Sequence, residues 1–168
     1  MKHKGNFEML DLVTLVKECA PQVEPSTMLA VIRTESRGQP FIINDNSIKK
    51  SFVFNDKNRA IEVSYALIQK NHNLDFGLTQ INLKNAQKYH LTLNRVFDPC
   101  ENVKYGGLIL TNAYLKNSKT NGEQAALLKS FSVYNTGNTH KGFTNGYVGK
   151  VVNNATVIQI PPHKQEQK

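Results

Sequence analysis

An apolar helix that ends in an acidic residue constrains this chain more than any other feature. Ser26 or Thr27 is expected to cap its start, and Gly38 with Pro40 ends it. Its apolar residues are the most concentrated in the chain: Met28, Leu29, Val31 and Ile32. Glu35 lies in the last turn, where the negative end of the helix dipole and partial burial both disfavour a charged carboxylate. The sequence therefore predicts a raised pKa for Glu35, as a general acid at neutral pH requires.

The rest of the chain predicts further helices around one short β-prone region. Apolar residues recur at three- and four-residue spacing in most segments, which is typical of helices that bury one face. The predicted helices span 7–19, 58–71, 83–89, 99–116, 122–134 and 146–156. Two apolar runs, 41–43 and 52–54, predict a small hairpin or irregular β-lobe, and 135–146 is expected to form a loop. The pattern indicates an α+β fold that is mainly helical.

The length of 168 residues indicates one domain, and the sequence contains neither an internal repeat nor an obvious linker. We expect the domain to span 1–158 and the polar tail, 159–168, to be disordered. No apolar run approaches the roughly 18–20 residues that a membrane span needs. The first ten residues lack the apolar segment of a secretory signal, so no signal peptide is visible.

The chain is basic, with 21 Lys and Arg against 13 Asp and Glu and a net charge of +8. This excess suits an anionic partner such as an acidic polymer, the cell wall or a nucleic acid. The lysines are scattered and no nucleic-acid-binding motif accompanies them, so nucleic acid is not the expected partner. Solubility alone is the simpler reading of the charge.

The cysteines and histidines do not indicate a metal site. The five histidines show no ligand-like spacing, and no CxxC motif is present. The two cysteines, Cys19 and Cys100, are either two buried thiols or one disulfide. A bridge between them would close a loop of about 80 residues and stabilise the fold by roughly 4 kcal/mol. Neither a metal nor an organic cofactor is expected.

Three short motifs occur in the order found in one enzyme family. Residues 30–36, Ala-Val-Ile-Arg-Thr-Glu-Ser, are followed by Gly-Leu-Thr-Gln at 77–80 and Tyr-Asn-Thr-Gly at 134–137. This series resembles the three motifs of the soluble lytic transglycosylases, in which the catalytic Glu precedes a Ser. The resemblance implies a lysozyme-like fold, with a helical lobe and a small β-prone lobe on the two sides of a glycan cleft.

Longer segments resemble one branch of this family, the wall-cleaving component of type IV secretion and conjugation systems. The matching segments are 19–21, 75–82, 96–100 and 142–148, and the similarity extends over roughly 10–155. Cysteines after the first helix and after an Asp-Pro pair are typical of that branch. The resemblance thus implies a Cys19–Cys100 disulfide, a periplasmic location, and secretion-system subunits as partners of a protein that is itself monomeric.

The family's chemistry requires only one carboxylic acid. Glu35 would protonate the glycosidic oxygen between N-acetylmuramic acid and N-acetylglucosamine, and would then deprotonate the C6 hydroxyl to close a 1,6-anhydro ring. Many other glycosidases use a second carboxylate. Asp75 and Asp98 are the nearest candidates by motif, and capping or turn formation is the expected role of both.

Other site residues are expected by carry-over from the motifs. Gln80 would bind sugar or tether its own loop, and the Tyr134 hydroxyl would lie near Glu35 unless this ring belongs to the core. Asn135 would contact sugar or stabilise its loop. Ser36 would bind near the reacting sugar or cap the helix end, and Tyr147 would line the cleft or pack.

Two further residues bear on the second motif. Asn82 would tether the backbone of the second-motif loop. Thr79 replaces the usual Met of the family, which leaves open what substrate affinity and subsite shape to expect.

Three alternatives to a lytic transglycosylase stay open at this stage. A lysozyme-type hydrolase would need a second base to activate water. A non-catalytic scaffold would bind glycan or secretion subunits without using Glu35. A nucleic-acid binder is supported only by the net charge.

Overall fold

The computed structural model describes residues 9–157, in which helices dominate and one small antiparallel sheet is present. The helices are α1 (Met9–Cys19), α2 (Pro25–Ser36), α3 (Lys57–Gln69), α4 (Leu83–Lys88), α5 (Leu93–Val96), α6 (Pro99–Ser118), α7 (Glu123–Thr136), α8 (Lys141–Thr144) and α9 (Tyr147–Val157). The strands are β1 (Ile42–Asp45), β2 (Lys50–Val53), β3 (Leu74–Phe76) and β4 (Ile81–Asn82). The predicted α+β, mainly helical fold is therefore confirmed.

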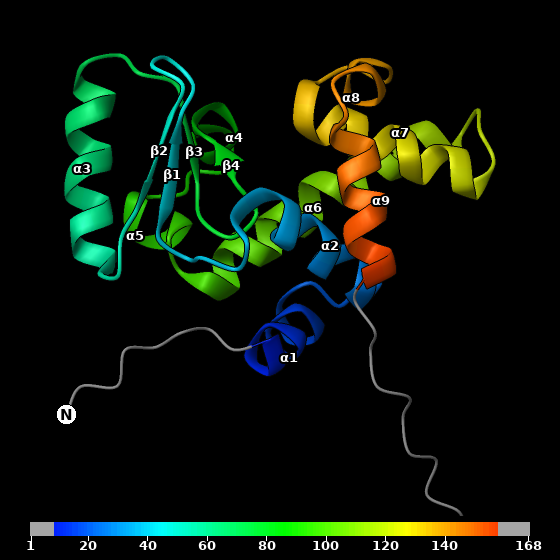
Figure 1. Ribbon diagram of the computed structural model, residues 1–168, viewed down its shortest axis with the longest axis horizontal. Coiled ribbons are helices and arrows are strands. Elements are labelled where there is room, and N and C mark those ends of the chain that lie inside the picture. Colours follow the sequence, from blue (N-terminus) through cyan, green and yellow to red (C-terminus); the bar gives the residue numbers. More distant parts are fainter. Residues whose placement is uncertain (1–8, 158–168) are drawn as a thin grey trace, which may run out of the picture.

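The molecule has two lobes, and each has its own hydrophobic core (Figure 1). The helical lobe comprises α1, α2, α7, α8 and α9, and its core includes nearly all of the apolar face of α2. The sheet lobe comprises the four strands with α3, α4 and α5. Phe76 and Phe97 meet edge to face in its core, with ring centroids 5.6 Å apart. Helix α6 contacts elements of both lobes and joins them.

The sheet has the strand order β2-β1-β3-β4, and all its neighbouring strands are antiparallel. Successive side chains of a strand point to opposite faces. Ile43 and Phe76 are fully buried and pack into the sheet-lobe core with residues of α3. The other face of the sheet, which carries Asn44 and Asp75, is turned toward the helical lobe.

Helix α2 is close to its predicted span, but its start differs from the prediction. Glu24 occupies the N-cap position without a side-chain cap, and Pro25 begins the helix, so neither Ser26 nor Thr27 is the cap. The fixed φ of proline suits the first helical position, where no backbone N–H is needed. At the other end Arg37 and Gly38 adopt left-handed φ angles of 54° and 79°, which turn the chain directly after Glu35.

Four short elements were not predicted: β3, β4, α5 and α8. Strands of two or three residues are too short to show a periodicity. They form because β3 pairs with β1, some 30 residues earlier in the chain, and this pairing is visible only after folding. Helix α8 divides the loop expected over 135–146.

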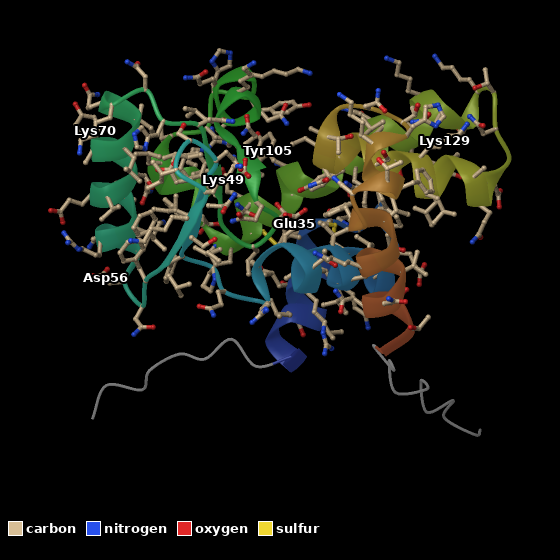
Figure 2. The ribbon with its side chains drawn as sticks, turned by 45° about the horizontal axis from the view of Figure 1, so that its top comes forward. Glu35, Lys49, Asp56, Lys70, Tyr105 and Lys129 are labelled. Carbon is tan, nitrogen blue, oxygen red and sulfur yellow. A yellow bond between two sulfur atoms is a disulfide. The ribbon has the colours of Figure 1, made fainter. Side chains whose placement is uncertain are left out.

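The positive charge is distributed over both lobes. Figure 2 labels Lys70 at the end of α3 and Lys129 on α7, on opposite sides of the molecule, with Lys49 in the turn between β1 and β2. Among residues 9–157, no helix is both long and apolar enough to cross a membrane. The predicted tail, 159–168, and the first two residues of the predicted helix 7–19 lie outside the described residues.

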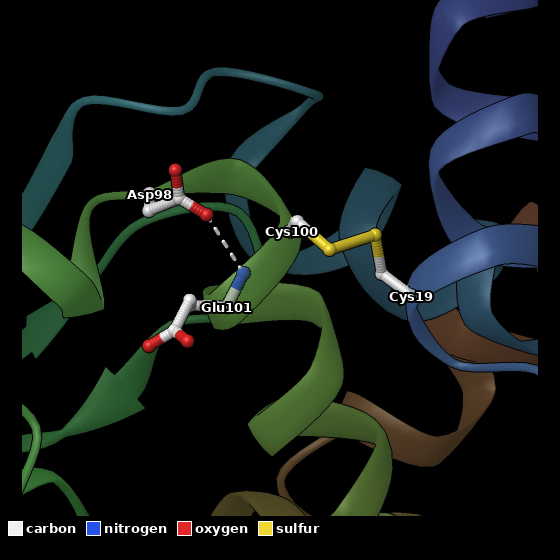
Figure 3. The surroundings of a disulfide bond; sticks show 4 residues. All are labelled: Cys19, Asp98, Cys100 and Glu101. Atoms are coloured by element: carbon white, nitrogen blue, oxygen red, sulfur yellow. Dashed lines mark hydrogen bonds between the residues drawn. A yellow bond between two sulfur atoms is a disulfide. The ribbon is translucent and has the colours of Figure 1, made fainter.

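A disulfide joins the helical lobe to α6 (Figure 3). Cys19 at the end of α1 is bonded to Cys100 in the first turn of α6, with a Cα–Cα distance of 5.3 Å. The Asp98 side chain caps the same helix and accepts a hydrogen bond from the Glu101 N–H at 3.0 Å. The disulfide implied by the resemblance and the capping role expected of Asp98 are both confirmed.

Candidate active site

A cleft of about 750 Å³ lies between the sheet lobe and the helical lobe. On one side are polar residues of the strands and of α4, and on the other are residues from α2 and α7. Glu35 lies at the centre of the molecule, where the last turn of α2 reaches the cleft (Figure 2). Volumes of roughly 300–1,000 Å³ are typical of ligand sites.

Burial changes the protonation of Glu35. Loss of solvation raises its pKa from 4.5 to about 8, because an apolar surrounding penalises the charged form. The Tyr147 hydroxyl opposes this shift by interacting with the carboxylate, and the charge of Asp75 adds to it. The sequence prediction of a raised pKa agrees with this. A carboxyl that keeps its proton at neutral pH can donate it to a leaving oxygen.

Tyr147 lies behind Glu35 rather than on the cleft surface. Its side chain on α9 is buried, with 7% exposure, and it is not among the residues that line the cleft. Within the described part of the chain its hydroxyl makes no hydrogen bond of good geometry, yet it lies close enough to influence the Glu35 carboxyl. Burial, followed by the charge of Glu35, raises the Tyr147 pKa, so the hydroxyl remains protonated. The expectation that Tyr147 lines the cleft is thus corrected.

Tyr134 does line the cleft, but its hydroxyl bonds elsewhere than expected. It donates a hydrogen bond to the backbone carbonyl of Thr79 at 2.6 Å, which connects α7 to the second motif. Burial is the main cause of its raised pKa, and the charge of Glu35 is the next. The phenol therefore lies close to Glu35 while holding the loop that faces it.

The second motif forms a tight turn that requires special backbone angles. Gly77 has a φ of +74°, and a Cβ there would lie 2.5 Å from Asn102 Nδ2, so only glycine fits. Gln80 has a φ of +54°, and its Nε2 donates to the Gly77 carbonyl at 3.0 Å. Gln80 also lines the cleft. It therefore tethers its loop and is available to substrate, which were the two roles considered for it.

Thr79 does not form part of the sugar site. Its side chain is fully buried between α6 and the second motif, so it does not line the cleft. Its hydroxyl donates to Asn102 Oδ1 at 2.7 Å, and its N–H donates to the same oxygen at 2.8 Å. The Thr79 hydroxyl therefore forms its hydrogen bonds inside the protein and not with a ligand in the cleft.

Asn102 is a structural residue of the site that the sequence did not indicate. Its Nδ2 donates to the carbonyls of Phe76 at 2.9 Å and Val96 at 2.8 Å, while its Oδ1 receives the two bonds from Thr79. One buried amide thus fixes both ends of the second motif. An Asn two residues after a Cys, within a helix, carries no sequence signal of this role.

A row of polar residues crosses the cleft face of the sheet. The strand registers pair Ser51 with Asn44, Asn44 with Asp75, and Asp75 with Asn82. All four line the cleft. Asp75 accepts hydrogen bonds from Asn46 Nδ2 at 3.0 Å and Asn82 Nδ2 at 2.8 Å. The expectation that Asp75 serves only capping or turn formation is therefore wrong, because it is a strand residue on the cleft wall.

The remaining predicted residues have distinct positions. Ser36 is 2% exposed, and its hydroxyl donates to the Ile32 carbonyl at 3.0 Å and accepts from Gly38 N–H at 3.2 Å. It closes the helix end and does not reach the cleft, so the expected sugar contact is corrected. Asn135 is exposed on the cleft wall and accepts a hydrogen bond from Asn145. Asn82 caps α4 and contacts the Leu74 carbonyl, as a tether of the second motif would.

A second cavity of similar size lies on another face of α2. It has a volume of about 700 Å³ and is lined by basic, amide and apolar side chains, including Arg33, Arg37 and Lys150. Its lining within residues 9–157 contains no carboxylate. The buried carboxyl of Glu35 lines the first cleft and not this cavity. In the same residues, no group of three or more His, Cys, Asp or Glu is arranged to hold a metal ion.

Comparison with known proteins agrees with this geometry. Residues 13–156 match the family described as the transglycosylase SLT domain. The protein virB1 of Agrobacterium fabrum is 35% identical over 146 residues, which are 87% of this chain and 59% of that protein. The type IV secretion system protein virB1 of Brucella abortus is 33% identical over 163 residues, which are 91% of this chain and 67% of that protein.

This chain thus spans somewhat more than half the length of the Agrobacterium relative. No solved structure gives a significant match. The similarity confirms the lysozyme-like fold expected from the three motifs and covers Glu35 and the whole cleft. The chain belongs to the transglycosylase SLT domain family.

Proposed function

We propose that this chain is a peptidoglycan lytic transglycosylase that cleaves the β-1,4 bond between N-acetylmuramic acid and N-acetylglucosamine. One observation carries the proposal: Glu35, a carboxyl whose pKa burial raises to about 8, lines a cleft that has a polar wall opposite it. A protonated acid without a metal or an organic cofactor is what cleavage of a glycosidic bond requires.

In the proposed reaction Glu35 acts first as acid and then as base. Its proton passes to the glycosidic oxygen, and the bond from that oxygen to C1 of N-acetylmuramic acid breaks. The C6 hydroxyl oxygen of the same sugar then bonds to C1, and its proton returns to the Glu35 carboxylate. The product is a 1,6-anhydro sugar, water is not consumed, and the acid is regenerated.

The cleft walls suit an N-acetylated glycan. Amide and hydroxyl side chains on the sheet wall, such as Asn44 and Ser51, offer both donors and acceptors to sugar hydroxyls and acetamido groups. Gln80, Tyr134 and Asn135 contribute from the second motif and from α7. We propose these three as substrate contacts, while Tyr147 keeps the Glu35 carboxyl in place from behind.

The names of the relatives suggest the biological setting. A type IV secretion system must cross the cell wall, and a protein that opens the wall locally would serve its assembly. We therefore propose a periplasmic location, peptidoglycan strands as substrate, and secretion-system subunits as partners of a monomeric enzyme. The disulfide supports an oxidising compartment, since such bonds persist outside the cytosol.

The proposal is tested by digesting purified peptidoglycan and analysing the soluble muropeptides by mass spectrometry. The wild type should release anhydro-muropeptides, and Glu35→Gln should lower the rate by about 10³-fold or more, because the general acid is lost. Glu62→Gln, the same chemical change on the exposed face of α3, should leave the rate unchanged.

Two other outcomes would replace the proposal. Products heavier by one water would identify a lysozyme-type hydrolase, for which Asp75 on the cleft wall would be the candidate base. Absence of cleavage from several wall types, with glycan binding retained, would identify a scaffold instead of an enzyme.

A further inference from the structure

We propose that the second cavity, between α1, α2 and α9, is a docking site for an acidic segment of another polypeptide. We call it the basic cavity, after Arg33, Arg37 and Lys150 in its lining. The inference goes beyond the proposed function and does not depend on cleavage of peptidoglycan in the cleft. It follows from the charge of the cavity, from the polar groups beside that charge, and from its position on another face of α2 than the cleft.

Three basic side chains from two helices meet at the basic cavity. Arg33 and Arg37 are at the C-terminal end of α2, and Lys150 is on α9, which lies beside α2 (Figure 1). All three are exposed, and none of the ion pairs that the described side chains form includes them. Like charges that share one small space repel each other, so an anionic group bound between them would be stabilised.

Helix stability accounts for only part of this charge. The negative end of the α2 dipole favours positive charge at Arg33 and Arg37. The same effect disfavours Lys150, which is among the first four residues of α9. Arg37 also has a φ of +54°, a left-handed angle for which glycine is the usual residue at a helix end. Lys150 and Arg37 therefore go against local preferences, and a ligand for their charges gives both a reason.

The basic cavity is formed in the protein without a ligand. Asn154 Nδ2 on α9 donates to Thr34 Oγ1 on α2 at 2.9 Å, and Thr34 Oγ1 donates to the Ala30 carbonyl at 2.7 Å. These bonds join the two helices at the cavity, so little ordering is needed when a ligand binds. Asn153 also lines the cavity, and its exposed amide offers a donor and an acceptor to a peptide backbone.

An acidic peptide suits these groups better than a nucleic acid or a membrane surface. Guanidinium groups bind carboxylates through two parallel hydrogen bonds, and amides bind the N–H and C=O groups of a peptide. The cavity has a volume of about 700 Å³ and a floor of Leu12, Leu29 and Ile32. A hollow of this kind accepts an inserted segment, whereas a bilayer or a duplex covers exposed surface.

Two nearer sources of an occupant are less suitable. The peptide stems of a glycan strand in the cleft would have to pass around α2, because among the described residues none lines both the cleft and the basic cavity. The two ends of this chain are not acidic, since residues 1–8 and 158–168 each contain two Lys and one Glu. Charge complementarity therefore favours a separate polypeptide.

The test measures binding of a fluorescein-labelled peptide of alternating Glu and Ser by fluorescence anisotropy, at low ionic strength where charges are least screened. The same peptide with Gln in place of Glu reports binding that does not depend on charge. Two variants, each without three exposed positive charges, are compared with the wild type. The cavity variant carries Arg33→Gln, Arg37→Gln and Lys150→Gln, and the control variant carries Arg59→Gln, Lys70→Gln and Lys88→Gln in the sheet lobe.

We expect the cavity variant to raise the Kd for the Glu peptide by about tenfold or more, because three charge contacts are lost. The control variant should raise it by less than about threefold, through the smaller net charge alone. In the wild type, the NMR signals that shift on addition of the peptide should belong to α2 and α9 around the cavity. Thermal melts of both variants check that each is folded.

Three results would overturn the inference. Equal losses of affinity in the two variants would show that net charge alone attracts the peptide. Unchanged affinity in a folded cavity variant would show that the peptide binds elsewhere. A Kd that rises in the cavity variant only for a DNA oligonucleotide, or only for vesicles with anionic lipid, would assign the cavity to that class of partner.

None of these measurements requires cleavage. A protein that binds the Glu peptide through the basic cavity but leaves peptidoglycan intact would therefore refute the proposed function and retain this inference.

Discussion

The two walls of the cleft are built from different chemistry. The helical wall presents Glu35 from an apolar helix, with Tyr147 buried behind it, and desolvation determines its protonation. The sheet wall presents amides, a hydroxyl and one carboxylate that bond to one another and remain accessible. We call the helical wall, where Glu35 is desolvated, the dry wall, and the accessible polar sheet wall the wet wall. In the proposed reaction, the group that gives up a proton lies in the dry wall, and the groups suited to binding a hydrated sugar lie in the wet wall.

Under the proposed function, this difference allows one cleft both to bind and to protonate a glycan. In water a glutamic acid would be ionised at neutral pH and useless as an acid. Burying the whole site would solve this problem but would exclude a polar substrate. A desolvated acid on one lobe and an accessible polar surface on the other meet both needs. Helix α6 contacts both lobes, and Asn102 on α6 holds the second motif between them.

The largest expected effect comes from breaking the disulfide between the helical lobe and α6. Replacing both Cys19 and Cys100 by Ser removes a bond between residues 81 apart and should lower the free energy of unfolding by about 4 kcal/mol. Thermal melts with and without reductant would measure this loss. If the two lobes depend on each other, one transition should move to lower temperature. Two separate transitions would show that the two lobes fold as independent units.

A pH-dependent change in stability should mark the dry wall. The Glu35 pKa is about 8 in the folded protein against 4.5 as its ordinary value, so the folded state binds the proton more tightly. Its contribution to stability is therefore complete below pH 4.5 and is lost as the pH rises to about 8.

The side chain in Glu35→Gln does not titrate. The unfolding free energy of this variant should therefore rise relative to that of the wild type over that pH interval, by on the order of 3 kcal/mol. Chemical denaturation of both proteins between pH 4 and 9 measures the difference. A constant difference across this range would contradict the idea that the wall is desolvated.

Breaking the support of the second motif should affect both walls at once. Asn102→Ala leaves the Thr79 N–H and the carbonyls of Phe76 and Val96 without their buried side-chain partner, and we expect a loss of about 2 kcal/mol in unfolding free energy.

Because Tyr134 and Gln80 depend on this loop, kcat should fall as well. Asn121→Ala serves as the control, because this amide follows the C-terminal end of α6 and donates to the Asn117 carbonyl, whereas Asn102 lies in the first turns of the helix. An unchanged kcat in a destabilised Asn102→Ala protein would show that the second motif supports the fold but not catalysis.

The smallest effect is expected on the wet wall. Asn44→Ala removes one amide from the polar row and should raise KM by about threefold while leaving kcat nearly constant, because a hydrogen bond at an accessible site contributes about 1 kcal/mol or less. Steady-state kinetics on soluble glycan strands would measure both constants. A large loss of kcat with KM nearly unchanged would show instead that the row acts in catalysis.

Local signals in the sequence identified much of the fold. The periodicity of α2 and α6, the Asp98 cap and the position of Glu35 at a helix end depend on neighbouring residues, so they could be predicted directly. The short strands β3 and β4 could not, because β3 exists only through pairing with β1 and β4 only through pairing with β3. For Ser36 the sequence left a sugar contact and a helix-capping role open, and the structure turns its hydroxyl inward to the Ile32 carbonyl. The Thr79 hydroxyl likewise forms its hydrogen bonds inside the protein.

The sequence by itself determined a mainly helical chain with an acid at the end of its most apolar helix, since helix formation and termination are decided over a few residues. Only the tertiary structure decided which residues face that acid. Asp75, Tyr147 and Asn102 are remote from Glu35 in the chain, and their roles come from strand register, helix packing and burial. Desolvation and long-range charge depend on the whole surrounding, and a linear sequence does not contain that information locally.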